Sequence, residues 1–508
     1  MTKHIFTTLF VGILFMSGIL LGAENTLTGK PLNILLITAD DMNYDALGVT
    51  GNKIRDITPH LDALANQGIL FNRAFVTASV CQPSRQVLMT GRYPHNNGGT
   101  GFNPIRSDVP TLQESLEKAG YFKGIMAKVP HLAPIEKFHW DVIVKAEQLT
   151  AGRDPEKFHA YCTDFFKQAK ESGKPFFLMA NSQDPHRPFA GSEQETNARH
   201  ANQTFPKVSR TIQPEEVEVP AFLPDIPDVR KEVAQYYTSV HRCDEAVGKI
   251  LLALHESGFE ENTLVMFLSD NGMAFPFAKT NVYRMSHQTP WIVRLPGVIQ
   301  AGQIDETHFI SGIDFTPTIL EAIGLPQIDN TDGKSFVPIL QGKKQPERDS
   351  VYTTFYQTSA RQDFPMRAIR TERYGYLFSP WSDGELIFRN ESQAGLTFNA
   401  MRQAAAENPE IAARVDLFLK RTLHEFYDYK DDPQALNNLV NNVSLKKELE
   451  RRQQLLLQKM KESGDPLTHA FETFLQTGKP DMTGINTGAA GNANAARRNN
   501  RNNRNNTN

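Results

Sequence analysis

Three short apolar runs, each followed closely by polar side chains, constrain the fold of this chain most strongly. The runs are Leu32–Thr38, Lys174–Asn181 and Asn262–Ser269. Continuously apolar, β-rich runs of this length are typical of strands buried on both faces of a parallel sheet. Stretches with helical periodicity, Thr58–Gly68 and Glu232–Ser257, lie between them. The pattern predicts an α/β fold built on a buried, mostly parallel sheet.

The polar residues that follow these runs are candidates for one common site. They are Asp40 and Asp41 after the first run, His186 after the second, and Asp270 and Asn271 after the third. Open α/β sheets bind their ligands at the carboxyl ends of the strands, so we expect these side chains to lie there. Adjacent carboxylates repel each other, and a divalent cation with oxygen ligands relieves that repulsion. The alternative for Asp40 and Asp41 is a helix N-cap and its neighbour.

The segment Ser79–Arg92 places a thiol at the start of a predicted helix. Pro83 and Ser84 are typical of a first helical turn, so Cys81 lies at or just before the N-terminus. Backbone N–H groups and the helix dipole favour an anion there, and Arg85 adds a planar fork suited to a tetrahedral oxyanion. The alternative is a buried cysteine before an ordinary helix.

Composition excludes several classes of protein. The 508 residues include 40% hydrophobic and 22% charged residues, and the net charge is −3, as in ordinary globular proteins. The basic residues are not in excess, so the charge balance does not indicate a nucleic-acid partner. The three cysteines are too few for a disulfide framework, although a bridge between Cys162 and Cys243 stays open.

The N-terminus predicts export. Met1–His4 precedes an apolar run, Ile5–Leu21, that ends in Gly22, Ala23 and Glu24, which is typical of a secretory signal peptide over residues 1–23. An uncleaved anchor is the alternative, since the run approaches the length of a membrane span. No cysteine for a lipid anchor follows the run. We expect a periplasmic or secreted protein with no stable membrane span after cleavage.

The remaining chain is predicted to form two structural units and a tail. A polar, turn-rich segment at Gly342–Gln345 separates an N-terminal domain, residues 31–342, from a C-terminal subdomain, residues 346–475. The subdomain is expected to contain a small antiparallel sheet, formed by the runs Ser350–Tyr356, Met366–Arg370 and Tyr374–Phe378. Residues 476–508 form an Asn/Arg-rich tail that we expect to be disordered.

The segment Cys81–Arg85, followed by Thr90, Gly91 and Arg92, resembles the signature of type I sulfatases, a family within the alkaline phosphatase superfamily. Other motifs that resemble this family occur in its order, over residues 31 to 460. The resemblance implies an alkaline-phosphatase-like fold. In that fold a large mixed, mostly parallel sheet is sandwiched by helices, and a smaller α+β subdomain follows at the C-terminus.

The resemblance implies a modified nucleophile and a metal site. In this family a maturation enzyme oxidises the cysteine to formylglycine, and the hydrated aldehyde supplies the attacking oxygen. The family's metal ligands correspond to Asp40, Asp41, Asp270, Asn271 and the modified Cys81. An all-oxygen shell suits one Ca²⁺ ion, with Mg²⁺ as the alternative, better than zinc or copper.

Five further positions carry catalytic roles by resemblance. Arg85, Lys128 and Lys279 would stabilise the charged sulfate oxygens, and His186 would protonate the leaving group. His131 would support the nucleophile. The family has a Gly-Lys-x-His element at this place, whereas here Ala127 replaces the glycine and His131 lies one residue further along, which weakens its assignment.

The order Asp-Asn-Gly, Phe-Pro, cation, Thr-Asn, Tyr over residues 270–283 is most similar to the sulfamidase branch, whose best-known member is the lysosomal heparan N-sulfatase. In that branch the cation is arginine, and here it is Lys279. Lysine keeps the charge but loses the bidentate fork. N-sulfate and O-sulfate therefore both stay open as substrates.

These observations predict a sulfatase that acts on a sulfated saccharide, with N-sulfated glucosamine as the favoured substrate. The alternatives, in order, are an O-sulfatase on other sulfated polysaccharide fragments, a phosphate mono- or diester hydrolase, and a sulfoglycan-binding protein in which Cys81 stays a thiol. The sugar, exo or endo action and the oligomeric state are not predicted.

Overall fold

The computed structural model describes residues 27–28, 31–196 and 203–488. The predicted signal peptide, residues 1–23, lies outside the described residues, and so does the predicted tail from residue 489 onward. Both therefore stay predictions. Within the described ranges, no helix combines the length and the apolar character that a membrane span needs.

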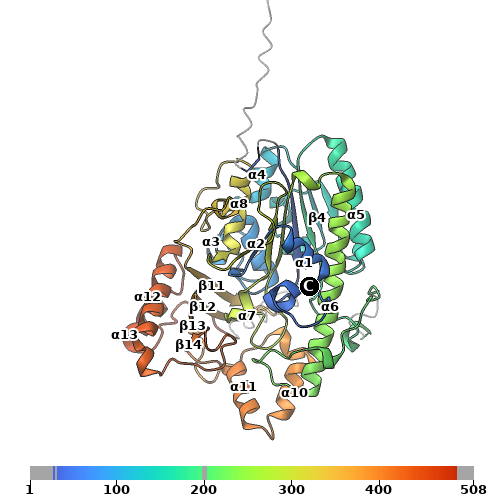
Figure 1. The fold of residues 1–508 in the computed structure, drawn as a ribbon. Coiled ribbons are helices and arrows are strands. Elements are labelled where there is room, and N and C mark those ends of the chain that lie inside the picture. The colour runs from blue at the N-terminus through green and yellow to red at the C-terminus, as the bar shows by residue number, and fades with distance from the viewer. Residues whose placement is uncertain (1–26, 29–30, 197–202, 489–508) are drawn as a thin grey trace, which may run out of the picture.

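One large mixed sheet forms the centre of the protein (Figure 1). Its strand order is β5-β4-β6-β1-β7-β8-β2-β9. The strands are β1 Asn33–Ala39, β2 Ile69–Phe71, β4 Phe122–Met126, β5 Val142–Val144, β6 Phe176–Asn181, β7 Thr263–Ser269, β8 Trp291–Arg294 and β9 Gln303–Asp305. All neighbouring pairs are parallel except those that β8 makes with β7 and β2. The predicted mostly parallel α/β sheet is confirmed, with β1 at its centre.

Helices cover both faces of this sheet (Figure 1). They are α1 Pro59–Asn66, α2 Cys81–Thr90, α3 Pro94–Asn97, α4 Leu112–Lys118, α5 Pro155–Ser172, α6 Pro227–Ser257, α7 Arg284–His287, α8 Phe315–Ala322 and α9 Val337–Leu340. Alternate side chains of β1 enter two apolar cores, as the pleat of a strand requires. Leu35 and Ile37 pack with residues of α1, α5 and α6, and Ile34 and Leu36 pack with residues of α2, α4 and α8.

A second, antiparallel sheet follows in the C-terminal part. Its strands are β11 Ser350–Gln357, β12 Asp363–Thr371, β13 Tyr374–Phe378 and β14 His424–Asp428, in that order. The sequence predicts the first three strands but not β14. The short strands β3 Ala74–Phe75 and β10 Ile310–Ser311 pair with each other. The predicted domain boundary falls between α9 and β11, and we retain it as a proposal.

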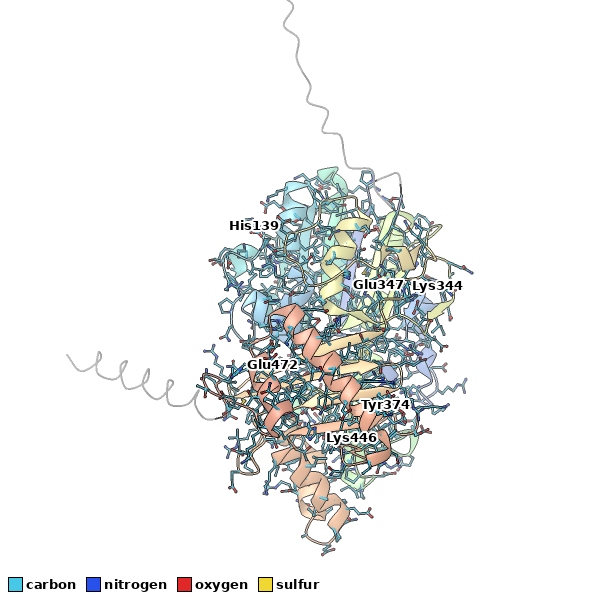
Figure 2. All side chains as sticks on the ribbon, turned by 90° about the vertical axis from the view of Figure 1, so that its left-hand side faces the viewer. His139, Lys344, Glu347, Tyr374, Lys446 and Glu472 are labelled. Carbon is cyan, nitrogen blue, oxygen red and sulfur yellow. The ribbon has the colours of Figure 1, made fainter. Side chains whose placement is uncertain are left out.

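Four helices accompany the second sheet: α10 Leu396–Ala404, α11 Pro409–Lys420, α12 Lys446–Ser463 and α13 Thr468–Thr477. Figure 2 shows this side of the protein, with Lys446 on α12, Glu472 on α13 and Tyr374 at the start of β13. Leu456 and Met460 of α12 and Phe471 of α13 pack with Tyr376 and Phe378 of β13 in one apolar core. The first residues of the predicted tail therefore belong to the end of α13 and to the chain that continues to residue 488.

Two local features are settled by the structure. The Asp314 side chain does not cap α8, because its carboxylate accepts hydrogen bonds from the Ser311 and Lys334 backbone N–H groups, both at 2.8 Å. It thus caps the preceding 3-10 turn instead. The structure also leaves all three cysteines free, so Cys162 and Cys243 are not bridged.

A buried ion pair ties the second sheet to the helices behind it. Arg367 of β12 and Asp465, which lies between α12 and α13, are both fully buried, with Nε and Oδ2 2.6 Å apart. The Tyr352 hydroxyl donates to the same Oδ2 at 2.7 Å. Burial alone would raise the pKa of Asp465, but the charges of Arg367 and His95 and the hydrogen bonds from Arg367 and Tyr352 together bring the pKa below its usual value. The carboxylate is therefore charged at neutral pH.

We predict that Asp465→Ala lowers the free energy of unfolding by about 3–5 kcal/mol, because it leaves the Arg367 charge buried without a partner. The exposed pair of Asp416 and Lys420 provides the control, and Asp416→Ala should cost less than about 1 kcal/mol. The Asp465 contribution should be complete above the unfolded-state pKa of about 3.9 and be lost at lower pH. Denaturant titrations at several pH values measure both, and equal losses in the two variants would refute the role of the pair.

Candidate active site

The carboxyl edge of the central sheet gathers the predicted acidic residues. β1 and β7 are parallel neighbours, so Asp40 and Asp41 leave the sheet beside Asp270 and Asn271. One potential ligand atom from each of Asp40, Asp41, Cys81 and Asp270 lies within 4.8 Å of the others. All these residues are buried. The convergence that the sequence predicts is therefore present in the structure.

Cys81 is the first residue of α2 and points into this cluster. Its Sγ donates to Asp40 Oδ1 at 3.2 Å. Burial, and then the charge of Asp40, raise the pKa of the thiol well above its usual value. A thiolate is therefore disfavoured at this position, although the helix N-terminus would favour one. The sulfur atom is therefore held as a neutral thiol at neutral pH.

Arg85, one turn further along α2, is fully buried and engaged by protein groups. Its Nη2 donates to Asp270 Oδ2 at 2.6 Å, and its Nη1 donates to Thr38 Oγ1 at 2.7 Å and to Asn181 Oδ1 at 2.6 Å. The guanidinium group therefore fixes the position of Asp270 against β1 and β6. Asn181 is a residue of the site that the sequence analysis did not single out.

Lys128 reaches the cluster from the loop after β4, where its ammonium group forms an ion pair with Asp40. Ala127 and Lys128 both adopt left-handed backbone conformations, with φ of 53° and 51°. This conformation costs a non-glycine residue about 1–2 kcal/mol. The site therefore keeps strained backbone at the place where the family resemblance implies a glycine before the lysine.

Lys279 lies between two carboxylates that come from distant parts of the chain. Its Nζ is 2.7 Å from Asp41 Oδ1 and 2.5 Å from Glu391 Oε1. Burial opposes the charged form, but these carboxylates, Asp41 foremost, raise the pKa of Lys279 well above its usual value. Glu391 was not predicted, because it lies in an irregular segment that carries no motif.

His186 faces the same cluster, with its Nε2 3.9 Å from Asp41 Oδ2. The Nδ1 atom lies 2.5 Å from the Arg187 carbonyl oxygen, so the Nδ1 proton is donated there and the Nε2 lone pair faces the site. Burial, and then Lys279, lower the pKa of His186. The neutral ring is therefore the resting form at neutral pH.

His131 lies at the margin of the site. Its ring meets Phe102 edge-on at a centroid distance of 5.8 Å, and its buried Nδ1 has no hydrogen-bond partner. Burial, then Lys128 and Arg85, lower its pKa well below the usual value. Within the described chain no hydrogen bond joins His131 to Cys81, so its predicted support of the nucleophile stays a prediction.

A network of charges holds the loop that carries His186. Asp184 forms ion pairs with Arg153 and with Arg242, whose Nε lies 2.6 Å from Asp184 Oδ2. The Asp184 carbonyl oxygen accepts from the backbone N–H of Asp40 at 3.1 Å. A cavity of about 820 Å³ opens beside His186 and is lined also by Arg153 and Glu391. This cavity is large enough for a saccharide.

The residues of the cluster fit a divalent cation. The buried Oδ1 of Asn271 has no hydrogen-bond partner, while its Nδ2 donates to Asp41 Oδ1 at 2.7 Å. Burial, despite Lys279 in one case and Arg85 in the other, raises the pKa of both Asp41 and Asp270 to about 7. A bound cation would favour both charged carboxylates and satisfy the amide oxygen. Asp40, Asp41, Asp270 and Asn271 could therefore hold Ca²⁺ or Mg²⁺.

The turn after Asn271 has no room for a side chain. A Cβ atom at Gly272 would lie 1.8 Å from the Met285 carbonyl oxygen, so only glycine fits there. The Gly272 N–H donates to the Ser286 carbonyl oxygen at 3.1 Å. This close approach of α7 fixes the path of the chain directly after the two candidate ligands.

Comparisons with known proteins agree with this arrangement. Residues 32–325 match the family described as sulfatase, and residues 273–386 match the family described as N-sulphoglucosamine sulphohydrolase, C-terminal. The chain is 29% identical to human N-sulphoglucosamine sulphohydrolase over 480 residues, which covers 88% of this chain and 93% of that protein. It is 27% identical over 453 residues to an ulvan-active sulfatase of Formosa agariphila, covering 88% and 84%.

The fold is similar to that of a solved structure described as a complex with its substrate D-glucosamine-2-N,6-O-disulfate. The TM-score is 0.65 at 19% identity, and the match covers 86% of this chain and 99% of that one. Such a likeness supports the fold, which is the α/β architecture described above.

We predict that the purified protein binds one Ca²⁺ ion and that Asn271→Ala weakens this binding about tenfold or more, because it removes an uncharged oxygen ligand. Asn66→Ala, at an exposed position of α1, provides the control and should bind as the wild type does. Calorimetry measures the affinities, and chelation should lower Tm until Ca²⁺ is restored. Equal affinity in both variants would place the cation elsewhere.

Proposed function

Because the chain belongs to the sulfatase family, we propose that it hydrolyses a sulfate group from a sulfated sugar or glycan fragment. The observation that carries this proposal is the position of Cys81. It begins a helix inside a cluster of carboxylates and ammonium groups, yet its own thiolate is disfavoured. Formylglycine made from Cys81 would satisfy both facts, since its hydrated aldehyde supplies an oxygen nucleophile at the helix N-terminus.

The surrounding charges would bind and orient the sulfate group. The ammonium groups of Lys128 and Lys279, which pair with Asp40 and Asp41, would supply positive charge to the sulfate oxygens. A divalent cation on the four oxygen ligands would add positive charge toward the sulfate oxygens. Arg85 acts through Asp270, which it keeps in position. We expect that fixed positive charge around the sulfate group in the transition state contributes most to the rate acceleration.

We assign the proton transfer to the leaving group to Nε2 of His186. The ring is held by its Nδ1 contact with the Arg187 carbonyl oxygen, so its orientation does not depend on the substrate. The neutral resting ring must gain a proton before it can donate one. A bound sulfate close to the ring would raise its pKa and favour that protonated form.

The favoured substrate is an N-sulfated glucosamine residue. Two findings support it: the match of residues 273–386 to the C-terminal family of N-sulphoglucosamine sulphohydrolases, which includes Lys279, and the similarity to the human enzyme. An O-sulfated glycan is the second candidate, which the similarity to an ulvan-active sulfatase supports. Lys279 stands where the resemblance implies an arginine, and this difference keeps the O-sulfated glycan as a candidate substrate.

Further proposals concern the location, the maturation and the domain organisation of the protein. We retain export directed by residues 1–23 and a formylglycine-generating enzyme as the maturation partner. We also retain the predicted tail from residue 489 onward and the division into residues 31–342 and 346–475. Glu391 contacts Lys279 across that division, so both units would contribute to the site.

We predict that the matured protein releases sulfate from N-sulfated glucosamine and that Cys81→Ala abolishes this release, because no other residue replaces the nucleophile. Glucosamine and galactosamine O-sulfates serve as parallel substrates. Release from the O-sulfates alone would keep the chemistry and reject the N-sulfate assignment. Mass spectrometry of the peptide that contains position 81 gives an independent control, and an unmodified thiol in active protein would exclude formylglycine.

We predict that Lys279→Met lowers kcat/KM about 10²–10³-fold, as expected for the loss of a cation aimed at developing charge. Lys279→Arg should retain activity within about tenfold, because the charge persists. Lys157→Met provides the control, since Lys157 is an exposed lysine that lines the cavity beside His186. If Lys279→Met and Lys157→Met have equal activity, Lys279 does not act on the sulfate.

A further inference from the structure

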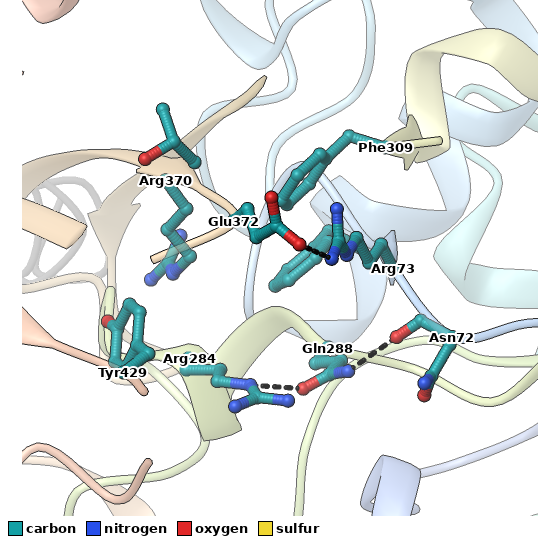
Figure 3. A pocket seen from close by; sticks show the side chains of 10 residues that line it. Asn72, Arg73, Arg284, Gln288, Phe309, Arg370, Glu372 and Tyr429 are labelled. Carbon is teal, nitrogen blue, oxygen red and sulfur yellow. Dashed lines mark hydrogen bonds and ion pairs between the residues drawn. The ribbon is translucent and has the colours of Figure 1, made fainter. Parts of the chain in front are cut away.

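A second pocket lies at the same carboxyl edge of the central sheet, toward its other end (Figure 3). It opens where the chain leaves β2, which runs parallel to β1 because both β7 and β2 are antiparallel to β8. The pocket has a volume of about 180 Å³ and shares no lining residue with the cavity beside His186. Its walls come from both the N-terminal and the C-terminal parts of the chain.

Three arginines line this pocket against a single carboxylate. They are Arg73 between β2 and β3, Arg284 at the start of α7 and Arg370 on β12. The carboxylate is Glu372, whose Oε1 lies 2.6 Å from Arg73 Nη2. The Glu372 side chain is 76% exposed, so this pair is weak. The pocket therefore has an excess of positive charge.

Arg370 is 1% exposed and carries an unpaired donor. Its Nη1 donates to Thr353 Oγ1 at 2.6 Å and its Nη2 donates to the Val282 carbonyl oxygen, but its Nε has no hydrogen-bond partner. Among the described residues no carboxylate lies within ion-pair distance of this guanidinium group. A buried charge without a counter-charge is rare in proteins because its desolvation is not compensated.

Arg284 lies beside it and is partly buried. Its Nε donates to Gln288 Oε1 at 2.6 Å, and the described part of the chain provides no ion-pair partner for its guanidinium group. Asp45 attracts it only from a longer range. Figure 3 shows Arg284 and Arg370 together with Tyr429 on one side of the pocket, and the Tyr429 ring centre lies 5.9 Å from the Arg284 guanidinium carbon. Burial lowers the pKa of both arginines, as expected for charges that lack a counter-ion.

We propose that this pocket binds a sulfate group, as a substituent of a saccharide chain or as the free ion. The Arg370 Nε and the Arg284 guanidinium group would donate to its oxygens, and the bound anion would supply the missing counter-charge. The stacked rings of Phe75 and Phe309, 5.8 Å apart, form an apolar wall beside the charges. The anion site follows from the arginines alone, whereas the choice of sulfate among oxyanions rests on the proposed function.

The pocket adjoins the segment that carries Lys279. Arg370 contacts the Val282 carbonyl oxygen, and Arg284 follows Tyr283 directly. A saccharide with several sulfate groups could thus be held at a second point while another sulfate is in the active site. An extended substrate would gain affinity from this second contact, and a monosaccharide would not.

Calorimetry with sodium sulfate, on the Cys81→Ala protein at constant ionic strength, tests the proposal. We expect two sulfate sites in this protein, and Arg284→Gln should remove one of them or weaken it about tenfold. Arg55→Gln, at a side chain that is 91% exposed, is the matched control and should keep both. If Arg284→Gln and Arg55→Gln bind sulfate identically, the proposal is wrong.

Two further measurements locate the site and identify the source of the sulfate. Crystals soaked in selenate should show an anomalous peak between Arg284 and Arg370, and a peak in the active site alone would overturn the proposal. A heparin-derived tetrasaccharide should also bind Arg284→Gln more weakly than Arg55→Gln. Weaker binding of both ligands indicates that the pocket takes sulfate as a saccharide substituent as well as the free ion, and a loss confined to sulfate indicates that only the free ion binds.

Controls separate this proposal from the proposed function. Sulfate release from a monosaccharide, measured with Cys81 intact, should be the same in Arg284→Gln and in wild type, because Arg284 does not line the active-site cavity. If Arg284→Gln does not fold, Arg73→Gln replaces it, since the Arg73 side chain is 25% exposed. Thermal unfolding without anion verifies the fold of each variant.

Discussion

The pairing of buried charges at the carboxyl edge of the sheet is the interaction on which the rest of the structure depends. Three cations and three carboxylates form three pairs: Arg85 with Asp270, Lys128 with Asp40, and Lys279 with Asp41. Each pair joins segments that are distant in sequence. Because an unpaired charge at these depths would be costly, the loops after β1, β4 and β7 and the start of α2 have to meet at one point.

This balance also explains why the site suits both a cation and an anion. Burial, with repulsion between neighbouring carboxylates as a smaller cause, raises the pKa values of Asp41 and Asp270 to about 7, and a divalent cation would favour their charged forms. The ammonium group of Lys128 pairs with Asp40, and that of Lys279 lies between Asp41 and Glu391, so both bring positive charge to the place where an anionic substrate would bind. The thiol of Cys81 lies between the two sides, with its Sγ 3.2 Å from Asp40 Oδ1.

The C-terminal part completes the site rather than merely flanking it. Glu391 contacts Lys279, the Asn390 side chain donates to Thr280 Oγ1 at 2.5 Å, and the Tyr283 hydroxyl donates to Glu425 at 2.6 Å. The loop after β7 is therefore held from the second sheet. The pocket lined by Arg73, Arg284 and Arg370 lies at the same junction. The contact between the two parts of the chain therefore forms a wall of the active site and also this second pocket.

Prediction from the sequence succeeded at positions where neighbouring residues form an apolar run or a recognisable motif. β1, β6 and β7 are continuous apolar runs, and the polar residues at their ends lie together as expected. It missed α5, although Asp154, Pro155 and Gly173 give the cap, first-turn and end signals of that helix. It also missed β14, because the strand character of this segment depends on pairing with β13. Glu391, Asn181 and Asp184 carry no local signal at all.

The sequence by itself determined the fold class, the start of the helix at Cys81 and the acidic residues at the strand ends, because period, turn residues and motif spacing are properties of neighbouring residues. Only the tertiary structure decided which charge pairs with which. It turned Arg85 toward Asp270, brought Glu391 to Lys279, and gave Arg284 and Arg370 no carboxylate partner among the described residues. Such pairings join residues separated by up to hundreds of positions, so they depend on how the sheet and its loops pack, which no local pattern records.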